Sequence, residues 1–152
     1  MKRLLLLVLL LFVSTAELSA QRDTEHWIAP YYETSSNNGR SLYLSTDSVT
    51  PFVVTINSNN VPIGTVTISK GSPQVFAVDK QYIATSTATD ALNVRTFGLH
   101  LVASTPFYCT LRLASSTTHA EILTSKGRAG IGNEFYVANT PGIYTGSTLF
   151  NF

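Results

Sequence analysis

The chain has 152 residues, 44% of them hydrophobic, and its 10 Lys and Arg residues nearly balance its 9 Asp and Glu residues. This balance, without any cluster of basic residues, argues against a nucleic-acid partner, because binding to phosphates requires a basic patch. The single cysteine, Cys109, excludes an intrachain disulfide.

The N-terminus has the three parts of a secretory signal peptide. Lys2 and Arg3 precede an unbroken apolar run at residues 4–13, and small or polar residues follow as far as Ala20. The apolar run has about half the length that a membrane-spanning helix needs. We predict that residues 1–20 are removed, with cleavage after Ala16 as the alternative. The mature protein is then secreted, periplasmic or on the outer cell surface, with no membrane span.

The remaining chain has the composition of a β-protein. It is rich in Thr, Ser, Val, Ile, Tyr and Phe, the residues that fit a pleated sheet. No segment keeps helical periodicity, whereas short alternating runs recur between turn signals. We expect residues 21–141 to form one all-β domain, an antiparallel β-sandwich or jelly-roll-like fold of about nine short strands. Residues 142–152 are predicted to form a C-terminal tail, or alternatively to begin a further region.

The first strand is expected at residues 26–32 (HWIAPYY), where Pro30 indicates a sheet edge. Asn38 and Gly39 then give a turn signal, because both tolerate positive φ. A second strand follows at 41–46, with Leu42 and Leu44 on one face. Further strands are expected at residues 51–57, 63–69, 74–78, 97–103, 107–113, 120–124 and 134–138.

Three connections are predicted from the turn signals. The turn segments 58–60 (SNN) and 70–73 (KGSP) separate the third, fourth and fifth strands, so we expect an antiparallel meander. Residues 85–94 are polar and without pattern, which predicts a long loop. The segment 104–106 (STP) is expected to join the sixth and seventh strands as a tight turn.

Three glycines, Gly127, Gly130 and Gly132, crowd together near the C-terminus. A glycine-rich phosphate cradle must open a helix, so that the amides of the helix meet the phosphates. Here the glycines precede Glu134–Phe135–Tyr136–Val137, which has the composition of a strand. We therefore expect the glycines to serve a tight connection with positive φ.

Cys109, as the only cysteine, is the one candidate for a thiol nucleophile. Alternation along the strand places Cys109 on the same face as Phe107, Leu111 and Leu113. A free cysteine in such surroundings behaves as a small buried hydrophobe, so we expect an inert thiol.

His119 and Glu121 form an H-x-E pair on one face of a strand, and they are the weak candidates for a metal site. Zinc deaminases use H-x-E together with two further cysteines, which this chain lacks. His100 is expected to face solvent, opposite to Leu99 and Leu101, and would complete a site if the strands align. The favoured alternative is that the three residues are ordinary polar side chains on a solvent-exposed sheet face. No metal or cofactor is therefore predicted.

Tyr31, Tyr32 and Tyr43 are the weak candidates for ligand binding, because exposed rings can stack on sugars. Alternation would put Trp27 on the same face as Tyr31 and leave Tyr32 on the other face. No nucleophile elbow or Ser/His/Asp grouping stands out. The favoured interpretation is a non-enzymatic binding or adhesion module, with an extracellular protein or glycan as its partner. A carbohydrate-binding module is the alternative, and a metal-dependent hydrolase is the least favoured.

Three stretches resemble a known family. Residues 24–28 (TEHWI) are similar to a Gly-x-Glu-Phe-Trp start. Residues 98–102 (GLHLV), followed by 105–107 (TPF), resemble a segment of glycine, alternating apolar strand and proline. Residues 132–137 (GNEFYV) resemble a Leu-Gly-x-Glu-Tyr-Tyr-Val mark. These are features of the N-terminal domain of the IgGFc-binding protein family, found in long surface proteins of Bacteroidetes-type bacteria.

The resemblance departs from the family pattern at three places. His26 stands where the family has Phe, Ser125 and Lys126 stand where Leu-Pro is common, and Ile131 replaces the Leu of the last mark. The resemblance implies a β-rich extracellular module, usually followed by adhesion-type or repeat domains. It carries over no catalytic residues. The family name reflects binding of antibody Fc by one mucin-like member.

Overall fold

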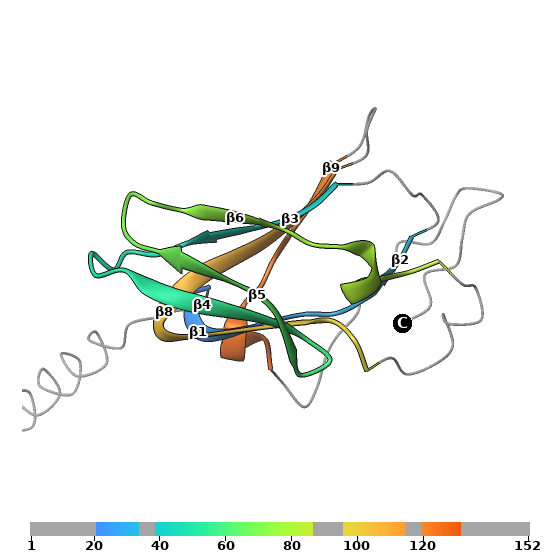
Figure 1. Cartoon of the computed structure of the whole chain (residues 1–152), viewed down its shortest axis with the longest axis horizontal. Helices are drawn as coiled ribbons and strands as arrows, with labels where there is room; N and C mark the ends of the chain where they lie inside the picture. Colours follow the sequence, from blue (N-terminus) through green and yellow to red (C-terminus); the bar gives the residue numbers. More distant parts are fainter. Residues whose placement is uncertain (1–20, 34–38, 87–95, 115–119, 132–152) are drawn as a thin grey trace, which may run out of the picture.

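The computed structural model describes residues 21–33, 39–86, 96–114 and 120–131, and these form an antiparallel β-sandwich of two layers (Figure 1). An all-β fold was expected, and it is confirmed. The strands are β1 (Asp23–Ile28), β2 (Tyr31–Tyr32), β3 (Gly39–Ser45), β4 (Phe52–Ser58), β5 (Val61–Ile68), β6 (Gln74–Ala77), β7 (Ala84–Thr85), β8 (Leu99–Ala114) and β9 (Ala120–Thr124). The described residues also form two short 3-10 helices, η1 (Lys80–Tyr82) and η3 (Gly127–Gly130).

One long strand, β8, belongs to both layers. Its first part lies between β4 and β1, and its second part lies between β3 and β9. We call β5, β4, β1 and the first part of β8 the first layer. The second layer consists of β6, β3, β9 and the rest of β8. Figure 1 shows β8 bending at one end of the molecule to pass from one layer to the other.

The bend in β8 replaces the tight turn that was expected at 104–106. From Val102 to Phe107 the strand takes five steps, while its partner β1 takes only two, from Glu25 to Asp23. The extra residues let β8 change direction without reversing. The Thr46 hydroxyl then donates a hydrogen bond to the Pro106 carbonyl at 3.0 Å, which ties the bend to the end of β3.

The β4–β5 hairpin is built as the turn signal predicts. Asn59 and Asn60 both have positive φ, at 50° and 62°, which is the conformation that two-residue hairpins favour. The expected meander is wrong beyond this hairpin. Its third strand, β6, does not pair with β5 but with β3 in the other layer, because the chain crosses between layers after Ile68.

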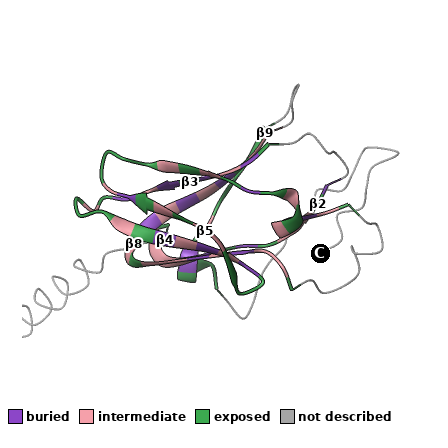
Figure 2. Ribbon diagram, viewed as in Figure 1, coloured by how far each residue is buried: buried purple, intermediate pink, exposed green. Residues whose placement is uncertain are grey.

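The core lies between the two layers, and Figure 2 shows buried residues along the strands of both. In β3 the expected alternation is confirmed, since Leu42 and Leu44 are buried while Tyr43 is exposed. Each such buried side chain stabilises the fold by roughly 1.5–3 kcal/mol. The core side chains are Ile28, Leu42, Leu44, Val54, Ile56, Ile68, Val78, Ile83, Leu99, Leu101, Phe107, Cys109 and Leu111.

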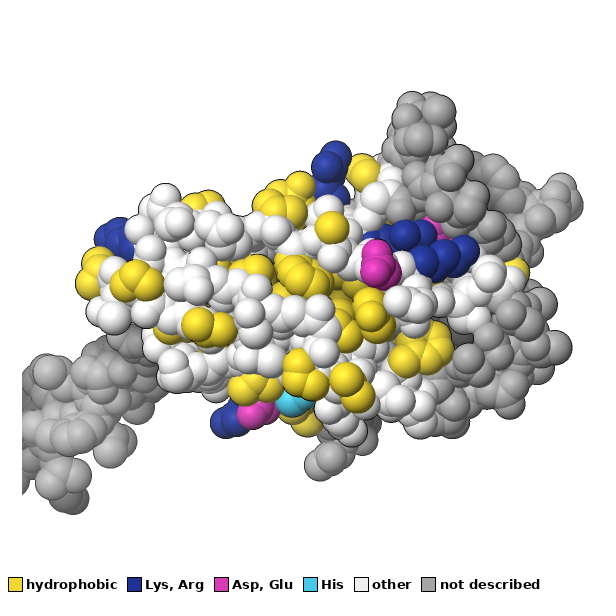
Figure 3. Space-filling model, viewed as in Figure 1, with side chains coloured by type: hydrophobic (Ala, Val, Ile, Leu, Met, Phe, Trp, Pro, Cys, Tyr) yellow, Lys and Arg dark blue, Asp and Glu magenta, His cyan; other side chains and the backbone are white. Residues whose placement is uncertain are grey.

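The outer edges of β5 and β6 face each other across the open side of the sandwich. The Phe76 ring of β6 crosses the opening and lies against Gly64 of β5, where a side chain would leave no room for it. Figure 3 shows hydrophobic side chains along the middle of this side of the molecule. Side-chain packing, and not a backbone ladder, therefore closes the sandwich here.

The strand expected at 26–32 is in fact two strands. β1 ends at Ile28, and after Pro30 the chain forms β2, which pairs in parallel with β7. Thr85, expected to open a long loop, is part of β7. The described residues hold nine strands, which equals the predicted number only by compensation: β2 and β7 are additional, β8 merges two expected strands, and one expected strand is not among the described residues. The strand expected at 134–138 lies outside the described residues.

Candidate functional site

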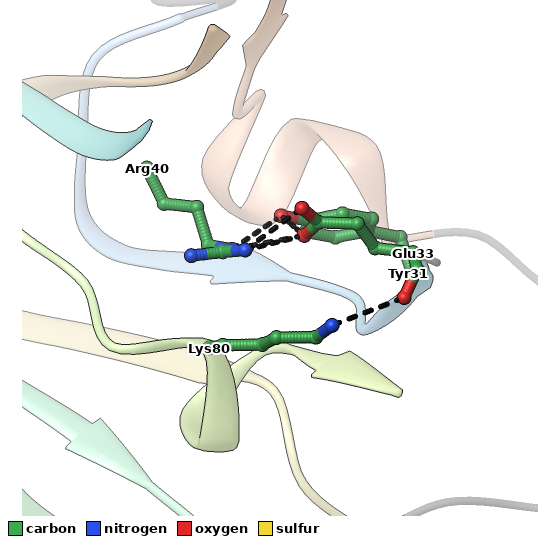
Figure 4. Close-up of polar contacts among 4 residues, drawn as sticks. All are labelled: Tyr31, Glu33, Arg40 and Lys80. Carbon is green, nitrogen blue, oxygen red and sulfur yellow. Dashed lines mark hydrogen bonds and ion pairs between the residues drawn. The ribbon is translucent and has the colours of Figure 1, made fainter. Parts of the chain in front are cut away.

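A cluster of buried polar side chains lies at the end of the sandwich where β2 meets β3 (Figure 4). Arg40 is on the inner face of β3, two positions before Leu42, so alternation directs a charged group toward the core. Its guanidinium meets both carboxylate oxygens of Glu33, at 2.8 and 2.7 Å. The Tyr31 hydroxyl donates to the same carboxylate at 3.0 Å and accepts from Arg40 Nε at 3.0 Å.

Electrostatics make this cluster a fixed unit. Burial disfavours the charge of Arg40, but the hydrogen bonds and the charge of Glu33 outweigh burial and raise the pKa of the guanidinium. Burial, the hydrogen bond to Glu33 and its negative charge raise the pKa of Tyr31 to about 12. The Lys80 ammonium donates to the Glu33 backbone carbonyl at 3.2 Å. The arrangement fastens β2 and η1 to β3.

The structure gives the three candidate tyrosines different surroundings. Tyr31 belongs to the buried cluster, so its hydroxyl is engaged. Its neighbour Tyr32 is 45% exposed on β2. Tyr43 is 42% exposed on the outer face of the second layer, across from Val75 and Thr110. Tyr31 and Tyr32 are on the small two-stranded sheet and Tyr43 is on the seven-stranded sheet, so sequence reasoning grouped rings that different sheets carry.

The candidate metal residues are not shown together. His119 lies outside the described residues. Glu121 is exposed on β9 and pairs with Leu113 near the end of β8, while His100 lies near the start of the same long strand. Within the described ranges, no group of three His, Cys, Asp or Glu side chains is placed to hold a metal ion.

His100 instead stacks on Trp27, the only tryptophan of the chain. The two residues are directly opposite each other in the β1–β8 pair, and their rings are nearly parallel, at 8°, with centroids 5.2 Å apart. Trp27 remains 39% exposed on the outer face of the first layer. Alternation alone placed His100 on an outer face, but only the pairing of β1 with β8 brings it to Trp27.

Polar side chains surround this aromatic pair. Asn57, across β8 from Trp27, donates its amide to the His100 carbonyl at 3.1 Å. Glu25 is two residues before Trp27, on the same face, and forms an ion pair with Arg128 at 3.2 Å. The His100 Nε2 atom is buried and makes no hydrogen bond with any of the described residues. The outer face of the first layer thus carries a partly exposed indole together with an amide side chain and a neutralised pair of charged groups.

The remaining groups with reactive potential are in the core. Cys109 is fully buried beside Phe107 and Leu111, as predicted, and burial raises the pKa of its thiol to about 12. His26 is also fully buried, with its Nε2 atom 2.8 Å from the Phe107 carbonyl. Burial lowers the pKa of His26, although the Phe107 carbonyl and Asp23 favour its charged form.

The glycine-rich segment forms a connection, and the positive φ expected of its glycines is found at Gly127 but not at Gly130. Gly127 has a φ of +58°, and a Cβ there would clash with the Asp23 side chain. It begins the four-residue η3, whose Arg128 amide donates to the Asp23 carboxylate at 2.7 Å. Gly132 and the strand expected after it lie outside the described residues. The segment therefore attaches the chain to β1. The Arg128 amide is bonded to Asp23 and is not available to a phosphate.

Comparison with known proteins gives no match: no family model, no curated protein and no solved structure aligns with this chain. The resemblance to the IgGFc-binding protein family therefore stays a prediction. No helix of the described ranges has the length and apolar character needed to cross a membrane.

Proposed function

We propose that this chain is a secreted or cell-surface binding module without enzymatic activity. The observation that carries the proposal is that reactive side chains are buried or held by partners, whereas aromatic and apolar side chains are exposed. Cys109 and His26 are in the core, and the carboxylate of Glu33 is held by Arg40 and Tyr31. The side chains left on the surface include Trp27 and several Val, Tyr and Ile residues on the outer faces of both layers. Exposed Trp and Tyr side chains are enriched among the residues that supply most of the binding energy at protein interfaces.

Two sequence features add to the proposal. Residues 1–20 have the pattern of a signal peptide, which would deliver the module outside the cytoplasm. The resemblance to the IgGFc-binding protein family points to the same location and to a role in adhesion.

A carbohydrate ligand is the second candidate, and the Trp27–His100 pair favours it. A sugar ring offers an apolar face for an indole and hydroxyl groups for amide and hydroxyl side chains. On the same outer face, β4 supplies such groups: Asn57 lies across β8 from Trp27, and Thr55 lies across β8 from Glu25. The Glu25–Arg128 ion pair leaves the face without a strong net charge. In this proposal Trp27 takes the role that the sequence suggested for Tyr31, Tyr32 or Tyr43.

The location is tested by fractionating the host cells and measuring the intact mass of the protein. The proposal expects a species that begins at Gln21, or at Glu17, on or outside the cell. A full-length species with its leader, found in the cytoplasm, would remove the basis for an extracellular role.

The ligand is tested on a glycan array, with a pull-down from the extracellular fraction in parallel. Because Trp27 is the only tryptophan, a bound sugar should change the intrinsic fluorescence directly. Trp27→Ala should abolish binding, while Tyr43→Ala, a matched exposed aromatic on the other layer, should retain it. Circular dichroism melting of both variants checks the fold. If no glycan binds and a protein is captured, the carbohydrate candidate fails and the wider proposal stands.

A further inference from the structure

The edge strand β9 is exposed along its whole length. All five residues, Ala120–Thr124, are exposed, and Ile122 and Leu123 are 64% and 38% exposed. In the described part of the chain, β9 pairs with β8 alone. Its sequence, AEILT, contains neither the Lys nor the Pro with which natural edge strands commonly prevent pairing.

The backbone of β9 presents three residues to its open side. The Ser125 amide donates to the Cys109 carbonyl of β8 at 3.0 Å. In an antiparallel pair, successive residues direct their N–H and C=O groups alternately toward and away from the neighbour. Leu123 and Glu121 therefore bond to β8, whereas the backbone groups of Ala120, Ile122 and Thr124 point outward.

The other outer strands of the seven-stranded sheet are better covered. Along β1, the Ser125 hydroxyl donates to the Trp27 carbonyl at 3.3 Å, and the Arg128 amide bonds to Asp23. β5 and β6 face each other, with Phe76 packed against Gly64. Among the described strands of this sheet, β9 is the edge that neither side chains nor backbone cover.

We propose that β9 pairs in antiparallel fashion with β9 of a second copy of this chain, about a two-fold axis at Ile122. The three outward residues are centred on Ile122, so the edge matches itself: Ile122 faces Ile122 of the second copy, and Ala120 faces Thr124. These three pairs can form up to about six backbone hydrogen bonds. The two copies then share one continuous second layer.

Charge and packing favour a second copy as the occupant. In this register Glu121 lies opposite Leu123 of the other copy, so no like charges face each other. On the outer face, Arg112 of each copy is separated from its equivalent by the two Ile122 side chains, because Arg112 pairs with Ile122. Pairing covers Ile122 and Leu123 in both copies at once. Because only five residues pair, the dimer is weak, with a Kd above ~1 µM.

Analytical ultracentrifugation tests the pairing over a range from about 1 µM to 1 mM, on protein purified in the form that its host accumulates. The wild type should shift from monomer to dimer across this range. Ile122→Pro removes only an outward N–H, so it should keep the fold and abolish the dimer. Ile122→Lys should do the same by charge repulsion. Val75→Lys, an equally exposed position on the outer face of the same layer, should still dimerise.

Amide hydrogen exchange at Ile122 distinguishes the alternatives. Protection that rises with protein concentration is expected. A monomer at every concentration, or a dimer that survives Ile122→Pro, would overturn the proposal. Protection of Ile122 that is independent of concentration would mean that residues of the same chain cover the edge. Protection that appears only after another protein is added would mean a foreign strand, and both results exclude the second copy.

Discussion

Arg40 and Glu33 form a two-point ion pair at the end of the sandwich, with their side chains only 7% and 5% exposed. Arg40 points inward because it follows the same alternation as Leu42 and Leu44. A buried guanidinium requires a partner, and Glu33 supplies it from the residue after β2. The ion pair therefore links β3 of the seven-stranded sheet to the end of β2 in the two-stranded sheet.

Glu33→Gln is expected to destabilise the fold by about 3–5 kcal/mol, because it leaves the Arg40 charge buried without compensation. Denaturant unfolding at pH 7, followed by circular dichroism, measures the change in the free energy of unfolding.

The double variant Glu33→Leu/Arg40→Met provides the control, because it removes both charges together. It should lose less stability than Glu33→Gln alone. Arg22→Gln breaks the exposed Arg22–Asp47 pair and should change stability by less than about 1 kcal/mol. If the double variant is as unstable as Glu33→Gln, packing and not charge holds this end together.

Gly64→Ala should destabilise the protein by about 1–3 kcal/mol through overpacking. The added Cβ would lie 2.7 Å from Cζ of Phe76, whose ring closes the open side of the sandwich. Adding Phe76→Leu should recover part of the loss, since a smaller side chain makes room. Gly39→Ala is the matched control in β3, with its nearest heavy atom at 3.8 Å, and should be close to neutral in the same unfolding assay. Equal losses at both glycines would contradict the packing argument.

Alternation and turn signals predicted much of the fold. They put Leu42 and Leu44 on one face of a strand, buried Cys109 and located the turn before Val61, because period-two patterning and positive φ at Asn60 are local properties. The bend in β8 was missed because Ser104–Thr105–Pro106 reads as a turn. Only the pairing of both halves of β8 with β1 shows that the chain stays extended there.

The candidate site was less predictable, because it depends on strand pairing. The sequence predicted an outer face for His100 but did not decide between core and surface for Trp27, and 73 positions separate the two residues in the numbering. Their contact arises from the register of β1 with β8. Likewise, nothing near Tyr31 indicates that its hydroxyl meets Arg40. Non-local register is the information that a single sequence does not carry.

His26 makes stability depend on pH. Burial lowers its pKa in the folded state, so the unfolded chain binds the proton more readily. The contribution of neutral His26 is fully present above the unfolded pKa of about 6.5, and it is lost progressively as the pH falls from that value through the lower pKa of the folded state. Urea unfolding between pH 8 and pH 5 should show this fall. His26→Gln keeps a donor for the Phe107 carbonyl and should flatten the profile in this window. An identical slope in the variant would assign the pH dependence to other groups.

Cys109 provides a direct probe of the closed core. Its side chain is fully buried and its thiol has a pKa raised to about 12, so the reactive thiolate is scarce at pH 8. We expect an aromatic disulfide reagent to label the folded protein only at the rate at which the core opens. The denatured chain should react at once, with one thiol per molecule, and Cys109→Ala should not react at all. Fast stoichiometric labelling of the folded protein would mean that the layers separate near β8. If labelling instead accelerates in step with the stability lost in Gly64→Ala and Glu33→Gln, exposure of Cys109 requires global unfolding.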